Sequence, residues 1–239
     1  LQPADGVFQK YAANNPNDEG VLEGSLLLAQ ALFERGDLLS SRSTLGLLPK
    51  KLRPERDWRR RLLRARITAA ESKLNGELLN QALLMGDQLR TIAEQRDWGN
   101  QLVAAYQLRA ELFEQKSDWD RAAQEYSHLL KIGLPLEIRR RAFLNVIIFR
   151  IKAGDFLGAL SVLRHLQLQA DLKSIQPLAK CMIGEIQLSL YRAGEENQLS
   201  LAASHFEKVS VQEQDISLQA RALWGLAQCR LFAGQVGGR

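Results

Sequence analysis

Cysteine and histidine are scarce in this chain, which has two Cys and three His among its 239 residues. Cys181 and Cys229 lie 48 residues apart, a spacing that fits neither a metal motif nor a disulfide framework, and both are expected to be buried thiols. The histidines, His128, His165 and His205, stand beside residues that are expected to pack. No HExxH, GxSxG or P-loop motif occurs. The sequence therefore predicts no catalytic residue, no metal and no cofactor.

Long apolar runs are also missing. The most apolar stretch, residues 142–151, contains Asn145 and Arg150 and falls short of the roughly 18 apolar residues that a membrane-spanning helix needs. This stretch is expected to form a buried helix. The first 20 residues are polar and begin with Leu1, so no signal peptide is expected. We interpret the chain as a piece of a longer array whose targeting segment lies elsewhere.

Positive charge is present but is concentrated in one segment. The chain has a net charge of +5, yet residues 50–66 contain nine cations and only two carboxylates, Glu55 and Asp57. A basic helical stripe of this kind can meet an acidic protein, an anionic lipid surface or a nucleic acid, or it can remain solvated. Nucleic acid is disfavoured because no recognition motif accompanies the charge. The predicted basic patch consists of Lys50, Lys51, Arg53, Arg56, Arg59, Arg60, Arg61 and Arg64.

A short pattern recurs every 37 to 43 residues, in which a small residue is followed four positions later by an aromatic or large apolar residue. A repeated unit of this length, rich in helix formers, is typical of arrays of helical hairpins. The third pair departs from the pattern because Gln81 is not small. The pairs are Ala4/Phe8, Ser41/Leu45, Gln81/Met85, Ala122/Tyr126, Ala159/Leu163 and Ala202/Phe206.

Apolar residues recur with helical spacing throughout the chain, for example at Leu63, Ile67 and Ala70. Turn pairs such as Gly154-Asp155 interrupt these runs, since Gly can end one helix and Asp can cap the next. The chain is therefore predicted to be all-α. The expected helices span residues 4–14, 20–35, 38–48, 55–75, 77–95, 98–115, 118–132, 136–153, 156–168, 174–193, 197–209 and 214–233.

The repeated unit resembles the tetratricopeptide repeat. FQKYAANNP (residues 8–16) and DWDRAAQEYSHLL (residues 118–130) are similar to its second helix, and Leu28-Ala29 with Gly36-Asp37 is similar to its first helix and turn. The period of about 40 residues is that of HEAT-type repeats and exceeds the usual 34, but the Gly-Asp turns favour the tetratricopeptide type. The resemblance implies a right-handed α-solenoid of stacked antiparallel helical hairpins, with residues 1–239 as a single repeat domain.

A second resemblance concerns the source and the cellular location of the protein. The stretches at residues 8–16, 26–37 and 178–194 resemble those of repeat proteins of the bacterial cell envelope. This resemblance implies a bacterial protein of the envelope or periplasm.

In such an array the first helix of each hairpin lines the concave face, where a partner protein or peptide can be held by hydrogen bonds and charge pairs. Some members of the family clamp a terminal carboxylate with Lys, Asn and Arg, and that set is not reproduced at Gln30, Arg66 and Gln107. The expected partner-binding residues of the concave face are Glu23, Gln30, Arg66, Lys73, Gln107, Glu111, Arg141, Glu185, Arg221 and Gln228.

The sequence therefore predicts a non-catalytic scaffold that binds a partner protein or peptide on the concave face, with the basic patch as a further contact to an anionic surface. One alternative is a ligand-sensing regulatory domain of a larger signalling or transcription protein, in which the groove holds a small molecule. Another alternative is an all-α enzyme.

Overall fold

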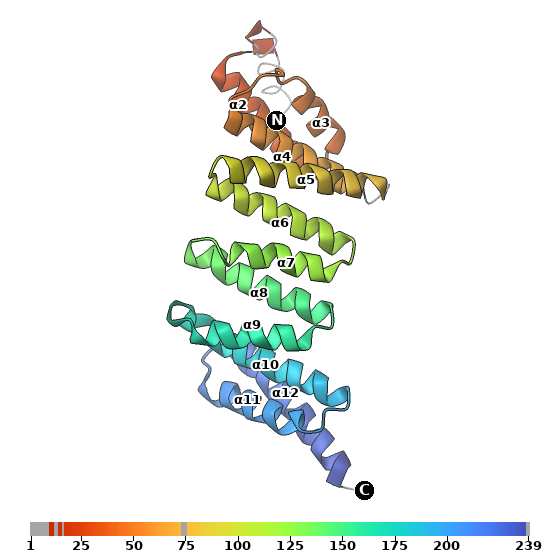
Figure 1. Ribbon diagram of the computed structural model, residues 1–239, viewed down its shortest axis with the longest axis vertical. Coiled ribbons are helices and arrows are strands. Elements are labelled where there is room, and N and C mark those ends of the chain that lie inside the picture. Colours follow the sequence, from red (N-terminus) through yellow and green to blue (C-terminus); the bar gives the residue numbers. More distant parts are fainter. Residues whose placement is uncertain (1–9, 12–13, 16, 73–75, 238–239) are drawn as a thin grey trace. The chain divides into compact units, whose positions relative to one another are not determined.

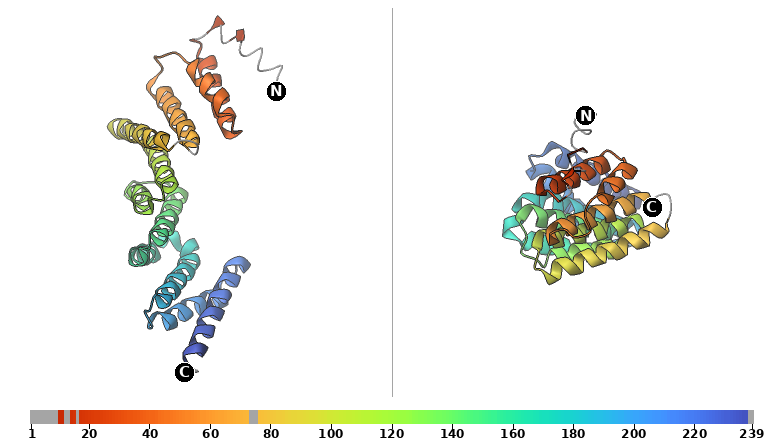
Figure 2. Two further views of the ribbon diagram at one scale, coloured as in Figure 1. Left: turned by 90° about the vertical axis from the view of Figure 1, so that its right-hand side faces the viewer. Right: turned by 90° about the horizontal axis from the view of Figure 1, so that it is seen from above.

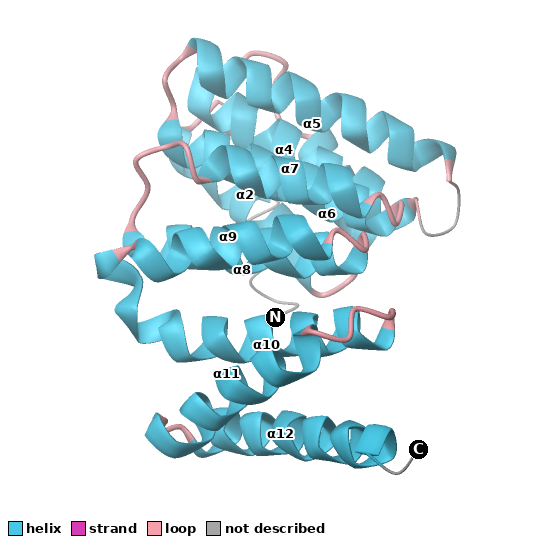
Figure 3. Ribbon diagram, turned by 60° about the horizontal axis from the view of Figure 1, so that its bottom comes forward, coloured by secondary structure: helices cyan, strands magenta, loops and turns pink. Residues whose placement is uncertain are grey.

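The computed structural model describes residues 10–11, 14–15, 17–72 and 76–237. Within these ranges the chain forms eleven α-helices and one 3-10 helix, and no strand (Figure 1, Figure 3). The predicted all-α class is therefore confirmed.

The first compact unit spans Leu1–Gln115. Its described helices are α2 (Glu19–Glu34), α3 (Leu38–Gly46), α4 (Pro54–Glu71), α5 (Glu77–Gln95) and α6 (Gly99–Gln115). Each of these helices packs against the next one along the chain, and α4 also contacts α2 and α6. The pairs α2/α3 and α4/α5 are therefore the expected antiparallel hairpins, and α2, α4 and α6 form a layer of first helices.

The second compact unit spans Lys116–Arg239, and whether the two units form one repeat domain stays a prediction. Its helices are α7 (Trp119–Leu129), α8 (Leu136–Lys152), α9 (Phe156–Leu168), η1 (Ala170–Ile175), α10 (Gln176–Arg192), α11 (Gln198–Gln212) and α12 (Ile216–Gly237). Hairpins α8/α9 and α10/α11 recur here, and α11 lies beside α12 (Figure 2). The short η1 was not expected, and it buries Leu172 and Ile175 in the core between α9 and α10.

The turns inside the hairpins explain why the helices end where the sequence predicts. At Gly36 and Gly154 the backbone has positive φ values of 81° and 78°, a conformation that glycine adopts without steric cost. The N–H of Asp155 then bonds back to the carbonyl of Arg150 at 2.9 Å, which closes the helix. The Asp155 carboxylate accepts the N–H of Gly158 at 2.8 Å and so begins the next helix.

The recurring small residues of the second helices are fully buried. Ser41, Ala122, Ala159 and Ala202 each have 0% of their surface exposed. A small side chain at this point lets the helices approach closely, and the Ser41 hydroxyl donates to the Ala29 carbonyl of α2 at 2.7 Å. The repeated pattern is therefore a packing pattern.

The pair predicted at Gln81 and Met85 is wrong by one residue. Gln81 is exposed and Met85 is half-buried, whereas Ala82 and Gly86 are buried. The Arg109 side chain of α6 lies against Gly86, where an added Cβ would come within 3.0 Å of it. A large residue is therefore missing from this repeat because the stem of an arginine takes its place.

A fully buried aromatic ring joins three helices of the second unit. Phe206 of α11 has 0% exposure, and its ring lies against Gly184 of α10 and Gly225 of α12. A Cβ added at these glycines would come within 2.9 Å and 2.5 Å of the ring, respectively. Both glycines are therefore needed for close packing of α10 and α12 onto α11.

Candidate functional site

A cleft of about 300 Å³ opens on the layer of first helices in the first unit. We name it the first-helix cleft. Its floor is apolar, and its edge carries one cation, one carboxylate and one amide. The lining residues are Phe33 of α2, Arg66, Ala69 and Ala70 of α4, and Leu108, Glu111, Leu112 and Gln115 of α6.

The charged edge of the first-helix cleft joins two residues that the sequence assigned to the concave face. Glu111 is exposed, yet the surrounding helices displace enough water to raise the pKa of its carboxyl, and the Arg66 guanidinium opposes this rise. A ligand that covers Arg66 and Glu111 must supply hydrogen-bonding partners to both, because uncompensated burial of charge is costly.

The hollow of the first-helix cleft arises from small residues. Ala69 and Ala70 stand where a longer side chain would fill the space between α4 and α6, and Phe33 is half-buried at the side. Leu108 and Leu112 of the floor are 2% and 0% exposed, so they belong to the core and cannot move aside. The cleft therefore suits one apolar side chain of a larger partner, since its volume lies at the lower end of the range for small-molecule pockets.

The other predicted concave-face residues of the first unit are largely engaged within the unit. Glu23 accepts from Arg59 of α4 at 2.7 Å, and this hydrogen bond lowers the pKa of its carboxyl. Gln30 donates to Glu34 at 2.9 Å, one turn further along α2. Gln107 is half-buried on α6. Lys73 lies outside the described residues.

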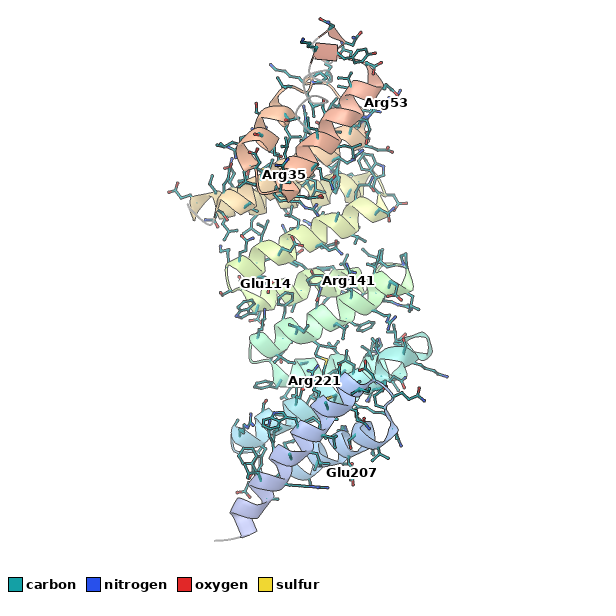
Figure 4. The ribbon with its side chains drawn as sticks, turned by 180° about the vertical axis from the view of Figure 1, so that it is seen from behind. Arg35, Arg53, Glu114, Arg141, Glu207 and Arg221 are labelled. Atoms are coloured by element: carbon teal, nitrogen blue, oxygen red, sulfur yellow. The ribbon has the colours of Figure 1, made fainter. Side chains whose placement is uncertain are left out.

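In the second unit, the predicted residues form pairs between first helices. Both oxygens of Glu185 on α10 accept from Arg221 of α12, at 2.6 and 2.7 Å, and this contact raises the pKa of Arg221. Gln228 of α12 accepts from Arg192 of α10 at 2.6 Å. Arg141 is exposed on α8 (Figure 4). These pairs stabilise the layer of first helices and leave fewer groups for a partner.

Carboxylates from α2 lie against the predicted basic patch. Glu19 pairs with Arg53 and Arg56, and Glu23 pairs with Arg56 and Arg59. Such contacts reduce the local positive potential, because each cation faces an anion at close range. A count of charges along residues 50–66 misses these acids, since they precede the segment by about 30 residues.

The rest of the basic patch divides into paired and exposed cations. Arg60 and Arg61 both bond to Asp57 on the same helix, and Arg60 also donates to the Pro49 carbonyl at 3.0 Å. The remaining members are exposed, and no ion pair is described for them. They are Lys50, Lys51 and Arg64.

A second cleft, of about 290 Å³, lies between the start of α4 and the end of α5. Its rim holds Asp57 and Arg61, which are already bonded to each other at 2.7 Å. Trp58, which lines it, is 3% exposed and donates its indole N–H to the Leu89 carbonyl at 3.1 Å. Gln95 of α5 and Arg96 at its C-terminal end also line this cleft, and both are exposed.

The sequence predicts Arg66 and Glu111 as residues of the concave face but does not predict the apolar floor between them. The sequence places Phe33 on one helical stripe with Ala29, a spacing that indicates packing within the hairpin and not a surface contact. The adjacent alanines Ala69 and Ala70 were the available signal, since two small residues in a row at a helix contact leave room for a foreign side chain.

The two cysteines are buried, as predicted, and desolvation raises the pKa of the Cys181 thiol to about 11. Within the described ranges, no set of three His, Cys, Asp or Glu side chains converges as a metal site would require. None of the helices described here combines the length and apolar character that crossing a membrane demands.

No family model and no curated protein matches the sequence. Among solved structures, the chain is similar to a crystal structure of a tetratricopeptide repeat protein from Parabacteroides merdae. The two share 13% identity, with 84% of this chain and 98% of that chain covered and a TM-score of 0.23. The hairpins of this chain make it an all-α helical repeat: a first helix ends at a positive-φ residue, and the next helix buries a small residue.

Proposed function

We propose that the chain is a non-catalytic scaffold that binds a partner protein or peptide along its first helices, with the first-helix cleft as the anchor point. The observation that carries the proposal is the combination of an apolar floor with a charged edge, Arg66 and Glu111, for which no hydrogen bond to a described residue is found. Most other polar groups of the first helices are engaged with each other, so the cleft is the part of this face best suited to a partner.

The lining residues define the contact. An apolar side chain of the partner enters between Ala70 and Leu112 and covers the half-buried Phe33. Arg66 donates to a carbonyl or carboxylate of the partner, and Glu111 accepts from a backbone or side-chain N–H. Burial of one large apolar side chain contributes about 1.5–3 kcal/mol, and the polar contacts add orientation more than affinity.

The exposed cations of the basic patch supply a second, weaker contact. Lys50, Lys51 and Arg64 are free to meet an anionic surface of the partner, whereas the arginines bonded to Glu19, Glu23 and Asp57 are not. Their contribution is expected to be small and sensitive to salt, because exposed ion pairs are screened by solvent.

The test is affinity capture from a detergent-solubilised bacterial lysate, the source indicated by the envelope resemblance. Three columns carry the chain itself, the variant Ala70→Trp and the variant Leu84→Trp. Ala70→Trp fills the cleft, whereas Leu84→Trp adds the same ring at an exposed position of α5. A specific protein retained by the chain and by Leu84→Trp, but reduced at least about tenfold by Ala70→Trp, supports the proposal.

Two further outcomes have definite meanings. Equal retention by Ala70→Trp, with the helical circular dichroism spectrum intact, removes the cleft from the interface. A fourth column carries the triple variant Lys50→Glu, Lys51→Glu, Arg64→Glu, and loss of retention on that column alone assigns binding to the exposed cations instead. If no column retains a specific protein, a thermal-shift screen with metabolites tests the ligand-sensing alternative.

A further inference from the structure

The cleft between the start of α4 and the end of α5 carries polar groups that the proposed function does not use. We name it the hairpin-end cleft. Three of its polar lining residues, Arg61, Gln95 and Arg96, are exposed. For the Gln95 amide and the Arg96 guanidinium, no hydrogen bond or ion pair with a described residue is found. These groups are therefore available to a ligand that enters the cleft.

The ion pair between Arg61 and Asp57 leaves part of the guanidinium open. Arg61 donates its Nε–H to Asp57 at 2.7 Å, and no described residue accepts from its two terminal nitrogens. The other oxygen of Asp57 accepts from Arg60. This pairing keeps Arg61 from an extended anionic surface, but it leaves the terminal nitrogens for a single carboxylate inside the cleft.

Arg96 is held at the rim by an aromatic ring. Its guanidinium carbon lies 5.1 Å from the centroid of the Trp98 ring, which is a cation–π contact. The Trp98 N–H bonds back to the Ala93 carbonyl at 2.9 Å and so fixes Trp98 beside the end of α5. Both arginines of the rim are therefore oriented before a ligand arrives, and such preorganisation lowers the entropic cost of binding.

The floor of the hairpin-end cleft is apolar. Trp58 is 3% exposed, and Leu52 and Ile92 are half-buried beside it. An apolar side chain that covers these residues is stabilised by the burial of apolar surface. A guanidinium binds a carboxylate through two parallel N–H groups. The cleft therefore suits a ligand that has an apolar group close to a carboxylate.

The charges at the cleft also favour an anion. Its lining residues contribute two cations against one carboxylate, Asp57, which is already paired. Lys50 and Lys51 are exposed and stand just before the lining residues in sequence. Glu55 and Asp97 adjoin the lining residues in sequence but do not line the cleft.

The hairpin-end cleft lies on a different side of α4 from the first-helix cleft. Spacings of three, four and seven residues put its α4 residues on one side of the helix. They are Pro54, Asp57, Trp58 and Arg61. Arg66, Ala69 and Ala70 of the first-helix cleft lie roughly a third of a turn further around, because an α-helix advances about 100° per residue. A ligand can therefore occupy one cleft without filling the other.

We propose that the hairpin-end cleft binds an acidic segment of a partner protein, in which an apolar residue and an Asp or Glu stand two positions apart. In an extended segment, side chains two positions apart point to the same side. The carboxylate of the segment accepts from Arg61 and Arg96, and its apolar side chain covers Trp58 and Ile92. The Gln95 amide bonds to the backbone of the segment. This site rests on the proposed scaffold function, since it names the chemistry of a bound protein, but it is separate from the first-helix cleft.

The test is titration of the full chain with capped peptides, followed by NMR at the indole N–H of Trp58. The probes GLSEG and GESLG carry the two orders of Leu and Glu, and acetylated and amidated ends remove the terminal charges. At least one probe is expected to bind with a Kd on the order of 1 mM. Replacing Glu by Gln, or Leu by Ser, in that peptide is expected to weaken binding about tenfold.

Variants of the chain locate the carboxylate. Arg61→Gln and Arg96→Gln are each expected to weaken binding of the same peptide about tenfold, since each removes a charged hydrogen-bond donor. Arg64→Gln is the matched control, because Arg64 is an exposed arginine of α4 that does not line the cleft. It is expected to bind like the parent, with the helical circular dichroism spectrum of every variant unchanged. Equal weakening by Arg64→Gln would mean that net charge alone attracts the peptide, and would overturn the proposal.

Ala70→Trp separates this site from the first-helix cleft. Peptide binding is expected to be unchanged in this variant, whether or not lysate capture finds a partner for the first-helix cleft. Loss of peptide binding in Ala70→Trp would move the peptide to the first-helix cleft and overturn the assignment. The proposal also fails if no peptide shifts the Trp58 signal, or if inorganic phosphate shifts it and the peptides do not.

Discussion

At the scale of single residues, the turns of this chain differ in whether the residue at positive φ is a glycine. Gly36 and Gly154 stand at positive φ, but Asp97 and Ser117 hold φ values of 52° and 57° with a Cβ present. A left-handed conformation costs a residue other than glycine roughly 1–2 kcal/mol, less for Asp and Asn. Ser117 is therefore a strained position in a turn that elsewhere carries glycine.

Replacing Ser117 by glycine is expected to raise the free energy of unfolding by about 0.5–1 kcal/mol, because the relief of strain exceeds the added freedom of the unfolded chain. The matched reverse change, Gly154→Ser, is expected to lower it by about 1 kcal/mol. Nothing lies within 4 Å of the Cβ that this change adds, so the backbone alone is tested. Urea denaturation measures the free energy of unfolding of both variants. A lower free energy of unfolding for Ser117→Gly would contradict the inference that Ser117 is strained.

The partly desolvated Glu111 carboxyl makes the stability of the folded chain depend on pH. Because its folded-state pKa is raised, the folded chain binds this proton more tightly than the unfolded chain does. Stability is therefore lost as pH rises from the unfolded-state pKa through the raised folded-state pKa, and the penalty is complete above the latter.

The variant Glu111→Gln removes this penalty. It is expected to be more stable than the parent at pH 7, with the difference vanishing below the ordinary glutamate value of 4.5. Urea denaturation at pH 4 and pH 7 measures the change, with the exposed Glu207→Gln on α11 as the control. Equal stability of parent and variant at both pH values would mean that the carboxylate is fully solvated.

At the scale of helices and hairpins, the aspartate in the turn between α8 and α9 makes two separate contacts. Asp155 caps α9 through the N–H of Gly158 and also pairs with Arg150 at the end of α8. One side chain thereby ties the beginning of a second helix to the end of its first helix.

Asp155→Ala is expected to destabilise the protein by about 1 kcal/mol and to speed amide hydrogen exchange in the first turn of α9, since the cap is lost. Asp155→Asn keeps a capping oxygen and removes only the charge, so it is expected to lose less. Hydrogen exchange measured by mass spectrometry on peptides from residues 150–165 distinguishes the two. Unchanged exchange in Asp155→Ala would show that packing alone holds the turn.

At the scale of the whole molecule, the helices were predictable because their signals are local. The bounds of α9 were predicted to the residue, since Gly154 and Asp155 mark its start and buried Leu163 and Leu166 follow the helical period. The error at Gln81 arose where the pattern depends on a different helix, because the Arg109 stem replaces the large residue.

The candidate site was less predictable because it is assembled from separate helices. The first-helix cleft needs Phe33, Ala70 and Leu112 side by side, and the sequence stripes show only that each faces a neighbour. The basic patch was overestimated for the same reason, because Glu19 and Glu23 reach it from another helix. Contacts between residues far apart in the sequence determine the charge and shape of a surface. The local periodicity of the sequence does not reveal such contacts.

The packing of the Phe206 ring against two other helices affects how the second unit unfolds. In a repeat array, terminal elements usually detach singly, because each contacts only its neighbours. Here α12 cannot leave without exposing a ring on which α10 also depends, and exposing a buried phenylalanine costs about 1.5–3 kcal/mol. Helices α10, α11 and α12 are therefore expected to unfold together and not one at a time.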